Sequence, residues 1–288
     1  MAKWLKKNMI NIFLAVVILA GLCLLLYPTF SDWWNSLHQS RAIASYVETV
    51  EGMSQEEMDA LLEEARAYNE RLWDKGNRWI PSPQEAEEYR SLLDVSGTGI
   101  MGYVNIPVID VSLPIYHGTD EAVLQVASGH IEGTSLPVGG ADTHAAISGH
   151  RGLPSAKLFT DLDKLSEGDI FTVTVLGQVL TYQIVQIRIV LPEDTSEMEL
   201  YRGEDYCTLQ TCTPYGVNTH RLLLRGKRIG DVKEALIAAA EAVRVPTYVV
   251  IPAVGVPMLF ILLAILLIFY KRRPRLPAED LRDPFKRK

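Results

Sequence analysis

Cysteine is scarce in this chain: its 288 residues include only three, Cys23, Cys207 and Cys212. Cys23 lies inside an apolar run, and the other two are five residues apart, so on one continuous strand they would point to opposite faces. This pattern excludes a disulfide-stabilised scaffold. Cys212 is therefore expected to be a free thiol, which favours a chemical role for it over a structural one.

Close metal-ligand spacings are also missing. His130, His144, His150 and Cys212 are conceivable zinc ligands, but none of them forms a pair with the spacing of H-E-x-x-H or C-x-x-C motifs. We therefore expect no metal site. Internal repeats and low-complexity tracts are absent as well.

Positive charge is sparse in the middle of the chain. Residues 31–270 carry 17 Lys and Arg against 32 Asp and Glu, a net charge of −15, although the whole chain has a net charge of −7. Phosphate contacts require a cationic face, so this balance argues against nucleic acid as a partner.

Two long apolar runs flank this acidic middle. Residues 8–31 and 245–270 contain no charge, and each exceeds the roughly 20 residues that a helix needs to cross a membrane. Lys and Arg precede the first run and follow the second, which predicts two membrane-spanning helices with both termini cytoplasmic and the middle outside. A cleaved signal peptide is the alternative for the first run, but no small-x-small site precedes Asp32.

Composition shifts divide the chain into expected segments. Ser54 with Glu57 marks a helix over 54–69, and a second short helix fits 82–93. The expected segments are a cytoplasmic tail with an anchor (1–31), a helical extension (32–99), a β-rich domain (100–230), a linker helix (231–247), a membrane helix (248–270) and a basic cytoplasmic tail (271–288).

From residue 100 onward the pattern changes to short β-type runs separated by Gly, Pro or Asp turns. Helical turns fit 122–127 and 156–162. Seven or eight strands at this spacing indicate a mostly β barrel or sandwich. The runs cover 102–107, 108–115, 143–148, 170–175, 180–190, 206–212 and 221–229.

The chemistry centres on Cys212, which ends one of these runs. A thiol becomes a nucleophile as thiolate, and a nearby imidazole or guanidinium favours that form. Arg221 lies nine residues on, beyond turn-type residues, which predicts two adjacent strands with its guanidinium beside the thiol. His150, between Gly149 and Gly152, suits a residue presented at a strand end, although spacing alone does not place it near Cys212.

The other histidines fit structural roles better. His117, His130 and His144 are interpreted as hydrogen-bonded loop residues, His38 as solvated, and His220 as part of a turn.

Longer strings around these residues resemble the sortases, the Gram-positive cell-surface cysteine transpeptidases, and in particular their class C, pilus-building branch. The resemblance covers about residues 68–230. It is carried by TLQTC with Arg221 downstream, by SGHRG upstream, and by the strings IPVIDVSLPIYHGT, GHIEGTSLPVGG, SGHRGLPSAKLFTDLDKL and TLQTCTPYGVNTHRLLLRGKR.

The resemblance implies an eight-stranded β-barrel in which His150, Cys212 and Arg221 meet at one end. Cys212 would attack the Thr–Gly bond of an LPXTG-like sorting signal, and His150 would protonate the leaving amine. Arg221 would stabilise the oxyanion or position the substrate. A lysine amine of another pilin would then resolve the thioester and leave an isopeptide bond. By the same resemblance, residues 100–230 would form the catalytic barrel, and no cofactor would be required.

One departure from the family pattern lies in residues 71–81. Class C enzymes usually carry an Asp-Pro-aromatic lid motif, which is absent here. Trp73 with Asp74, or Trp79, could fill the groove instead, with Asp74 pairing to Arg221; an ordinary surface loop is the equal alternative.

Three other functions remain open from the sequence. A sortase that attaches surface proteins to peptidoglycan would use the same thioester with a different amine. A secreted cysteine hydrolase would resolve the thioester with water. A non-enzymatic, membrane-anchored assembly factor would keep the three residues for structural reasons only.

Overall fold

The computed structural model describes residues 2–230. The linker helix, second membrane helix and basic tail expected over 231–288 lie outside these residues. The described elements are α1 (Ala2–Glu51), α2 (Gln55–Trp73), α3 (Pro83–Ser91), β1 (Ile100–Ile106), η1 (Pro107–Ile109), β2 (Val111–His117), α4 (Glu121–Leu124), β3 (Ser128–His130), β4 (Thr143–Gly149), η2 (Leu162–Lys164), β5 (Ile170–Val175), β6 (Gln178–Val190), η3 (Ser196–Met198), β7 (Asp205–Thr213) and β8 (His220–Arg228).

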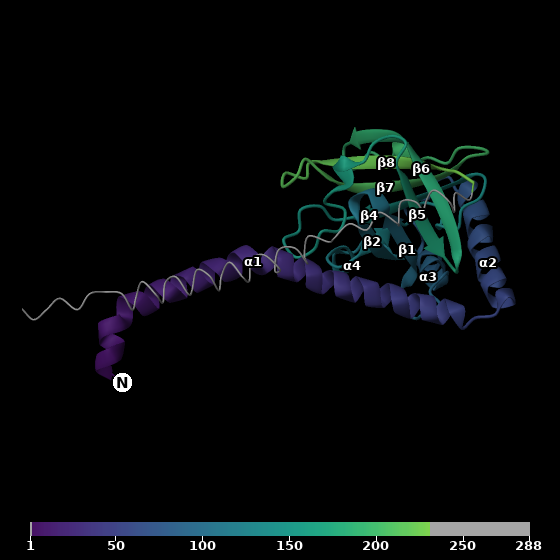
Figure 1. Cartoon of the computed structure of the whole chain (residues 1–288). Coiled ribbons are helices and arrows are strands. Elements are labelled where there is room, and N and C mark those ends of the chain that lie inside the picture. Colours follow the sequence, from purple (N-terminus) through teal and green to yellow (C-terminus); the bar gives the residue numbers. More distant parts are fainter. Residues whose placement is uncertain (1, 231–288) are drawn as a thin grey trace, which may run out of the picture. The chain divides into compact units, whose positions relative to one another are not determined.

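The eight strands close into a barrel in the order β1-β2-β3-β4-β7-β8-β6-β5 (Figure 1). Two neighbouring pairs, β2 with β3 and β4 with β7, are parallel, and the other pairs are antiparallel. The expected eight-stranded barrel is confirmed. The parallel β4–β7 pair matters most for function, because it joins strands that are far apart in sequence.

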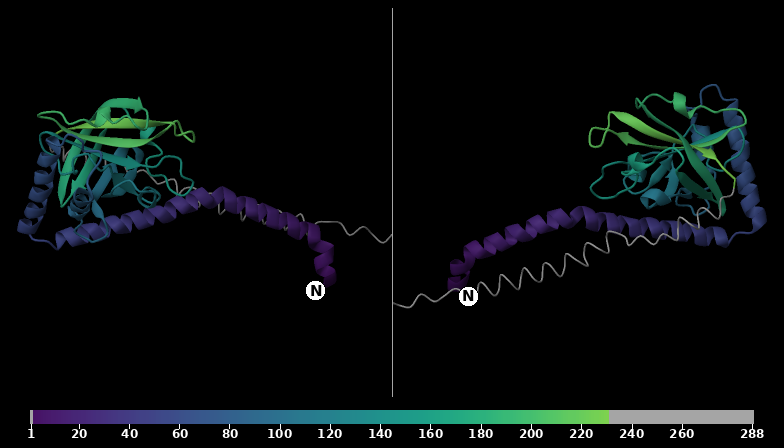
Figure 2. Two further views of the ribbon diagram at one scale, coloured as in Figure 1. Left: turned by 180° about the vertical axis from the view of Figure 1, so that it is seen from behind. Right: turned by 45° about the horizontal axis from the view of Figure 1, so that its top comes forward.

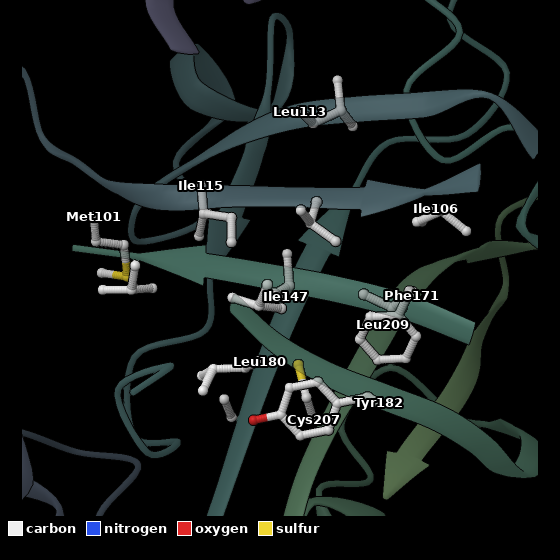
Figure 3. Packing of buried hydrophobic residues seen from close by; sticks show 14 of the residues in the cluster. Met101, Ile106, Leu113, Ile115, Ile147, Phe171, Leu180, Tyr182, Cys207 and Leu209 are labelled. Atoms are coloured by element: carbon white, nitrogen blue, oxygen red, sulfur yellow. The ribbon is translucent and has the colours of Figure 1, made fainter. Parts of the chain in front are cut away.

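Side chains along each strand point alternately into the barrel and toward its outer face. On β7, Cys207 and Leu209 belong to the core (Figure 3). Leu222 and Leu224 on β8 belong to it as well. Because successive side chains point to opposite faces, Cys212 and Leu223 lie on the outer face. Each buried apolar side chain of this kind contributes roughly 1.5–3 kcal/mol to stability.

Helices cover part of the barrel exterior, and their sequence signals explain where they begin. The Ser54–Glu57 capping box is present at the start of α2, and Ser82 with Glu85 forms a second one at α3. Both boxes satisfy backbone N–H groups that have no partner in the first helical turn.

Helix α1 runs without a break across the expected boundary between anchor and extension, with Pro28 inside it. Its N-terminal part is apolar and long enough to cross a membrane, and the apolar window is not buried against the barrel. Figure 2 shows α1 passing along the barrel in both views.

Two local features differ from the expected strands. The run over 108–115 is divided by Asp110, whose φ of 53° ends η1 before β2 begins. Strand β3 was not expected, because its three residues, Ser128–His130, are too few to show an alternating pattern.

Candidate active site

Cys212 and Arg221 face each other across the β7–β8 hairpin. The two strands are antiparallel, and the register places Cys212 directly opposite Arg221. Directly opposed residues have Cα atoms about 4.5–5.5 Å apart and side chains on the same face. The thiol is free and partly exposed on the outer face of the barrel. The expected pairing of these two strands therefore places a guanidinium on the face that carries the thiol.

His150 follows β4 directly, and β4 is the parallel neighbour of β7. Ser148 is in register with Gln210, so two further residues along each strand bring His150 level with Cys212. The strand ends are tied together because Thr211 Oγ1 donates to Gly149 O at 2.7 Å. Neighbouring strands lie about 4.8 Å apart. All three candidate residues are thus gathered at one end of three adjacent strands.

Glu121 on α4 is a further residue at this site. Its Oε2 lies 3.5 Å from Nε2 of His150, and its side chain is 72% exposed. His150 Nε2 is shielded from solvent and makes no hydrogen bond within residues 2–230. A hydrogen bond from Gln125 lowers the pKa of Glu121, and attraction to His150 adds to this effect. Sequence spacing gives no signal for this contact.

Arg221 is held at the end of the hairpin by the backbone. Its Nη1 donates to His220 O at 3.2 Å and to Asn218 O at 3.4 Å. A second arginine, Arg151, forms an ion pair with Asp163 and places Nη1 3.4 Å from Thr213 Oγ1. No role is assigned to Arg151 from the sequence, because the motif that contains it is interpreted through His150 alone.

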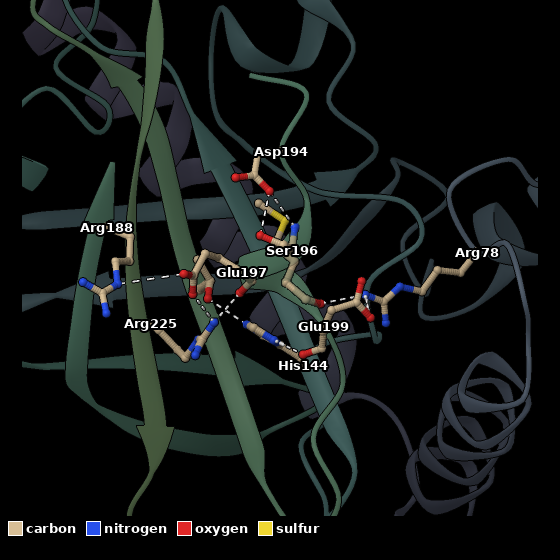
Figure 4. A network of polar contacts seen from close by, with 10 residues as sticks. Arg78, His144, Arg188, Asp194, Ser196, Glu197, Glu199 and Arg225 are labelled. Atoms are coloured by element: carbon tan, nitrogen blue, oxygen red, sulfur yellow. Dashed lines mark hydrogen bonds and ion pairs between the residues drawn. The ribbon is translucent and has the colours of Figure 1, made fainter. Parts of the chain in front are cut away.

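A polar network fixes the β6–β7 connection over the outer face of these strands (Figure 4). His144 Nδ1 donates to Glu199 O at 2.8 Å, and its Nε2 accepts from Thr208 Oγ1 at 2.7 Å. Burial lowers the pKa of His144 to about 4, so the ring is neutral near pH 7. Arg225 Nη2 donates to the backbone oxygen and carboxylate of Glu197 at 2.6 and 2.7 Å. These contacts hold η3 in place beside the site.

Of the three candidate lid residues, Trp79 is the one on the face that carries Cys212. It packs against a cluster formed by Ala146, Met198 and Leu223. Leu223 is two residues from Arg221 on β8, roughly 7 Å along the strand. The adjacent Arg78 is buried, and its Nη2 donates to Met198 O at 2.8 Å.

The remaining lid candidates lie elsewhere. The Trp73 ring is 5.0 Å from the Arg202 guanidinium and lines a cavity at the start of β4, about 20 Å from its His150 end. Asp74 is the exposed C-cap of α2. Within residues 2–230 no ion pair joins Asp74 to Arg221. The structure therefore does not bring Trp73 and Asp74 to the candidate site.

Two other groups considered from the sequence are buried structural residues. His130 Nε2 donates to Ser135 O at 2.8 Å, its Nδ1 accepts from Tyr89 Oη at 2.9 Å, and burial lowers its pKa to about 4. Burial raises the pKa of Cys207. Across the described part of the chain, no group of three or more His, Cys, Asp or Glu side chains could hold a metal ion.

Comparisons with known proteins find one family among the similar sequences and structures. A family model described as the sortase domain matches residues 104–229. The structure of sortase C1 from Streptococcus agalactiae is 50% identical, with a TM-score of 0.65 over 66% of this chain and 99% of that one. Clostridium perfringens sortase C, solved with the C-terminal cell wall sorting motif, is 39% identical, with a TM-score of 0.59 over 67% of this chain and 100% of that one.

A curated protein, sortase D of Bacillus subtilis, is 31% identical over 131 residues, 44% of this chain. The matched part spans 63% of the length of that protein.

Proposed function

Because the chain belongs to the sortase family and its barrel is similar to class C sortase structures, we propose that it is a cysteine transpeptidase that joins pilin subunits. The observation that carries this proposal is the register at one barrel end. Cys212 lies opposite Arg221, and His150 follows the strand parallel to β7. Such a set supplies a nucleophile, a proton carrier and an oxyanion stabiliser.

In the proposed reaction, the Cys212 thiolate attacks the carbonyl carbon of Thr in the sorting signal. The Thr–Gly bond breaks, its electron pair stays on the glycine nitrogen, and His150 gives that nitrogen a proton. Arg221 stabilises the negative oxygen of the tetrahedral intermediate. A lysine amine then attacks the thioester and loses a proton to His150, and the C–S bond breaks to restore the thiolate.

The proposed donor substrate is a pilin or surface protein with an LPXTG-like sorting signal. Support comes from the similar Clostridium perfringens sortase C, whose structure was solved with its C-terminal cell wall sorting motif. The acceptor is a lysine amine on another pilin, which makes each turnover extend a covalent polymer. Attachment of surface proteins to cell-wall peptidoglycan is the alternative, and it differs only in the incoming amine.

We propose that α1 anchors the enzyme in the membrane of a Gram-positive bacterium, with the barrel outside the cell. Its apolar N-terminal part is long enough to cross a bilayer, and basic residues precede that part. A pair of cytoplasmic termini, with a second membrane helix over 248–270, completes the proposed topology.

Trp79 is the proposed lid residue. It packs against the cluster of Ala146, Met198 and Leu223, and Leu223 lies two residues from Arg221 on the outer face of β8. Arg78 anchors this loop to the β6–β7 connection through Met198 O and the Glu199 carboxylate at 3.2 Å. A substrate would therefore have to displace the Trp79 ring from the groove.

The test is intact-mass spectrometry of the full-length protein in detergent micelles with an LPXTG-type peptide. We expect an adduct equal to the peptide without the residues after Thr. Cys212→Ala should abolish the adduct, and the matched variant Cys23→Ala should retain it. Failure of folded wild type and of a Trp79→Ala variant to form the adduct would favour the assembly-factor alternative.

Acceptor competition separates the enzymatic alternatives. With a pilin-derived lysine peptide, the acyl group should move to the lysine amine faster than to water. Preference for a peptidoglycan-type amine would indicate cell-wall attachment instead. Release by water at the same rate with and without acceptors would indicate a hydrolase.

A further inference from the structure

The second half of α1 is attached along the length of the barrel. Asn35 Nδ2 donates to Ser155 O at 2.7 Å, and Gln39 Nε2 donates to Val126 O at 2.8 Å. Further along the helix, Tyr46 Oη donates to Met101 O at 3.1 Å. The helix rises about 1.5 Å per residue, so these contacts cover about 16 Å. Such multiple contacts fix the direction of the helix relative to the barrel.

The contacts also reveal which end of the barrel α1 meets first. Ser155 lies in the loop that follows His150, and Val126 precedes Ser128, which is paired with Gly149 at the His150 end of β4. Tyr46 instead contacts Met101, near the start of β1 at the opposite end. Read toward its N-terminus, the helix therefore leaves the barrel at the end that carries the proposed catalytic residues.

Aromatic side chains mark the point of departure. Tyr27, Phe30, Trp33 and Trp34 lie within two helical turns, and Phe30 and Trp34 are 60% and 52% exposed. Trp and Tyr gather at membrane–water interfaces, directly beside an apolar span. Asp32, in the middle of this set, accepts from Lys157 N at 2.6 Å. The loop after His150 thus lies at the level of the aromatic residues.

The β7–β8 hairpin tip packs against this same loop after His150. Tyr215 and Val217 are 60% and 64% exposed. A Cβ atom on Gly152 would meet the Tyr215 ring at 3.1 Å, so the ring covers Gly152 closely. Gly152 is three residues, at most about 11 Å, from Ser155, the residue bonded to α1.

We propose that the catalytic end of the barrel faces the membrane and that Tyr215 and Val217 contact the lipid surface. The inference rests on the proposed anchoring by α1. With this orientation, the preferred substrate is a sorting signal that lies close to the bilayer, on a chain that is still attached to the membrane.

The contact is aromatic and apolar rather than electrostatic. The loop over 151–169 carries three basic residues and four acidic ones, so it offers no excess charge to anionic headgroups. Zwitterionic phosphatidylcholine, which has no net charge, should therefore serve as well as anionic phosphatidylglycerol. The basic residues of this loop are Arg151, Lys157 and Lys164, and the acidic ones are Asp161, Asp163, Glu167 and Asp169.

Photo-crosslinking of the full chain in phosphatidylcholine nanodiscs tests the contact. Benzoylphenylalanine replaces Tyr215 or, as a matched exposed aromatic at the other barrel end, Tyr201. A third variant carries it at Leu19 in the apolar part of α1. We expect lipid adducts, detected by mass spectrometry, at 215 and 19 and at least tenfold less at 201.

Each other outcome overturns part of the reasoning. No lipid adduct at 19 refutes the proposed anchoring itself. An adduct at 19 but none at 215, equal adducts at 215 and 201, or crosslinks from 215 only to protein refute the membrane-facing orientation while leaving the anchoring intact.

A kinetic comparison tests the consequence for substrate choice. Tyr215→Ser with Val217→Ser should slow acylation by a membrane-tethered sorting signal three- to tenfold, while acylation by a soluble peptide stays unchanged. Tyr201→Ser should change neither rate. Equal rates of the double variant and wild type with the tethered substrate contradict the proposed orientation, whereas failure of wild type with the soluble peptide concerns the proposed reaction instead.

Discussion

Gly149 ends strand β4 immediately before His150, and the structure leaves no room there for a side chain. A Cβ atom at this position would lie 2.7 Å from Cδ2 and 2.8 Å from Cγ of Phe159. The Phe159 ring is fully buried in the barrel core, and Phe159 N donates to His150 O at 3.1 Å. Gly149→Ala must therefore separate the strand end from the ring, and the movement is transmitted to the imidazole.

The size of the effect follows from these distances. Carbon atoms pack at about 3.5–4.0 Å, so the strand end and the ring must move apart by about 1 Å. Overpacking of this kind costs about 1–3 kcal/mol of stability. A displacement of about 1 Å at a reacting group costs roughly 100-fold in rate. We expect Gly149→Ala to lower the free energy of unfolding by about 1–3 kcal/mol and the acylation rate by about 10- to 100-fold.

Urea unfolding and the rate of adduct formation by intact mass measure the two effects. Gly230→Ala is the matched control, because a Cβ there meets nothing within 4 Å. The double variant Gly149→Ala with Phe159→Leu should recover most of the rate by removing the contacting ring. A wild-type rate in Gly149→Ala would refute the reasoning, and a slow double variant would show that the loss does not come from the Phe159 contact.

Arg221→Lys keeps the charge but loses the forked donors, so single-turnover acylation of Cys212 should slow about 100-fold; an unchanged rate contradicts the oxyanion role. Arg78→Ala should speed methanethiosulfonate labelling of Cys212 severalfold, because it removes the contact with Glu199; unchanged labelling contradicts an anchored lid. Burial lowers the pKa of His144 to about 4, below its usual 6.5, so the unfolded chain takes up that proton first as pH falls. The contribution of neutral His144 to the free energy of unfolding, present above about pH 6.5, should therefore shrink by roughly 3 kcal/mol toward pH 4. In urea unfolding, His144→Gln should show a flatter pH dependence than wild type.

Local sequence patterns predicted the parts of the fold that local physics decides. The alternation over 206–212 and 221–229 with turn residues between them indicates a hairpin, and this pairing sets Cys212 opposite Arg221. Both helical capping boxes lie where the Ser and Glu spacing favours them, although only the one at Ser54 was recognised. By contrast, the choice between barrel and sandwich depends on which edge strands meet, which periodicity does not encode.

Long-range pairing explains what the sequence alone could not give. His150 becomes the neighbour of Cys212 only because β4 and β7 pair in parallel across a long connection, and spacing carries no information on such a pair. The resemblance to a known family supplied that expectation. Glu121 reaches His150 for the same reason, through the pairing of β3 with β4. The unbroken α1 was missed because a change from apolar to amphipathic composition does not require a helix to end.

In the proposed reaction, the outer face of β4, β7 and β8 binds the substrate peptide as well as the Trp79 ring. A five-residue motif in extended form spans about 17 Å, whereas Leu223, a member of the cluster against which Trp79 packs, is only about 7 Å from the Cys212–Arg221 pair. With Trp79 as the proposed lid, a peptide bound along this face would overlap the ring, and its entry would require the Trp79 loop to leave.

That departure breaks the Arg78 contacts, which end on Met198 and Glu199 in the same β6–β7 connection that Arg225 holds through Glu197. Because both anchors act on one short segment, we expect them to be coupled. In a double-mutant cycle, Arg78→Ala and Arg225→Ala should accelerate Cys212 labelling by a factor that differs from the product of the single effects. Strict multiplicativity would mean that the Trp79 loop opens independently of the β6–β7 connection.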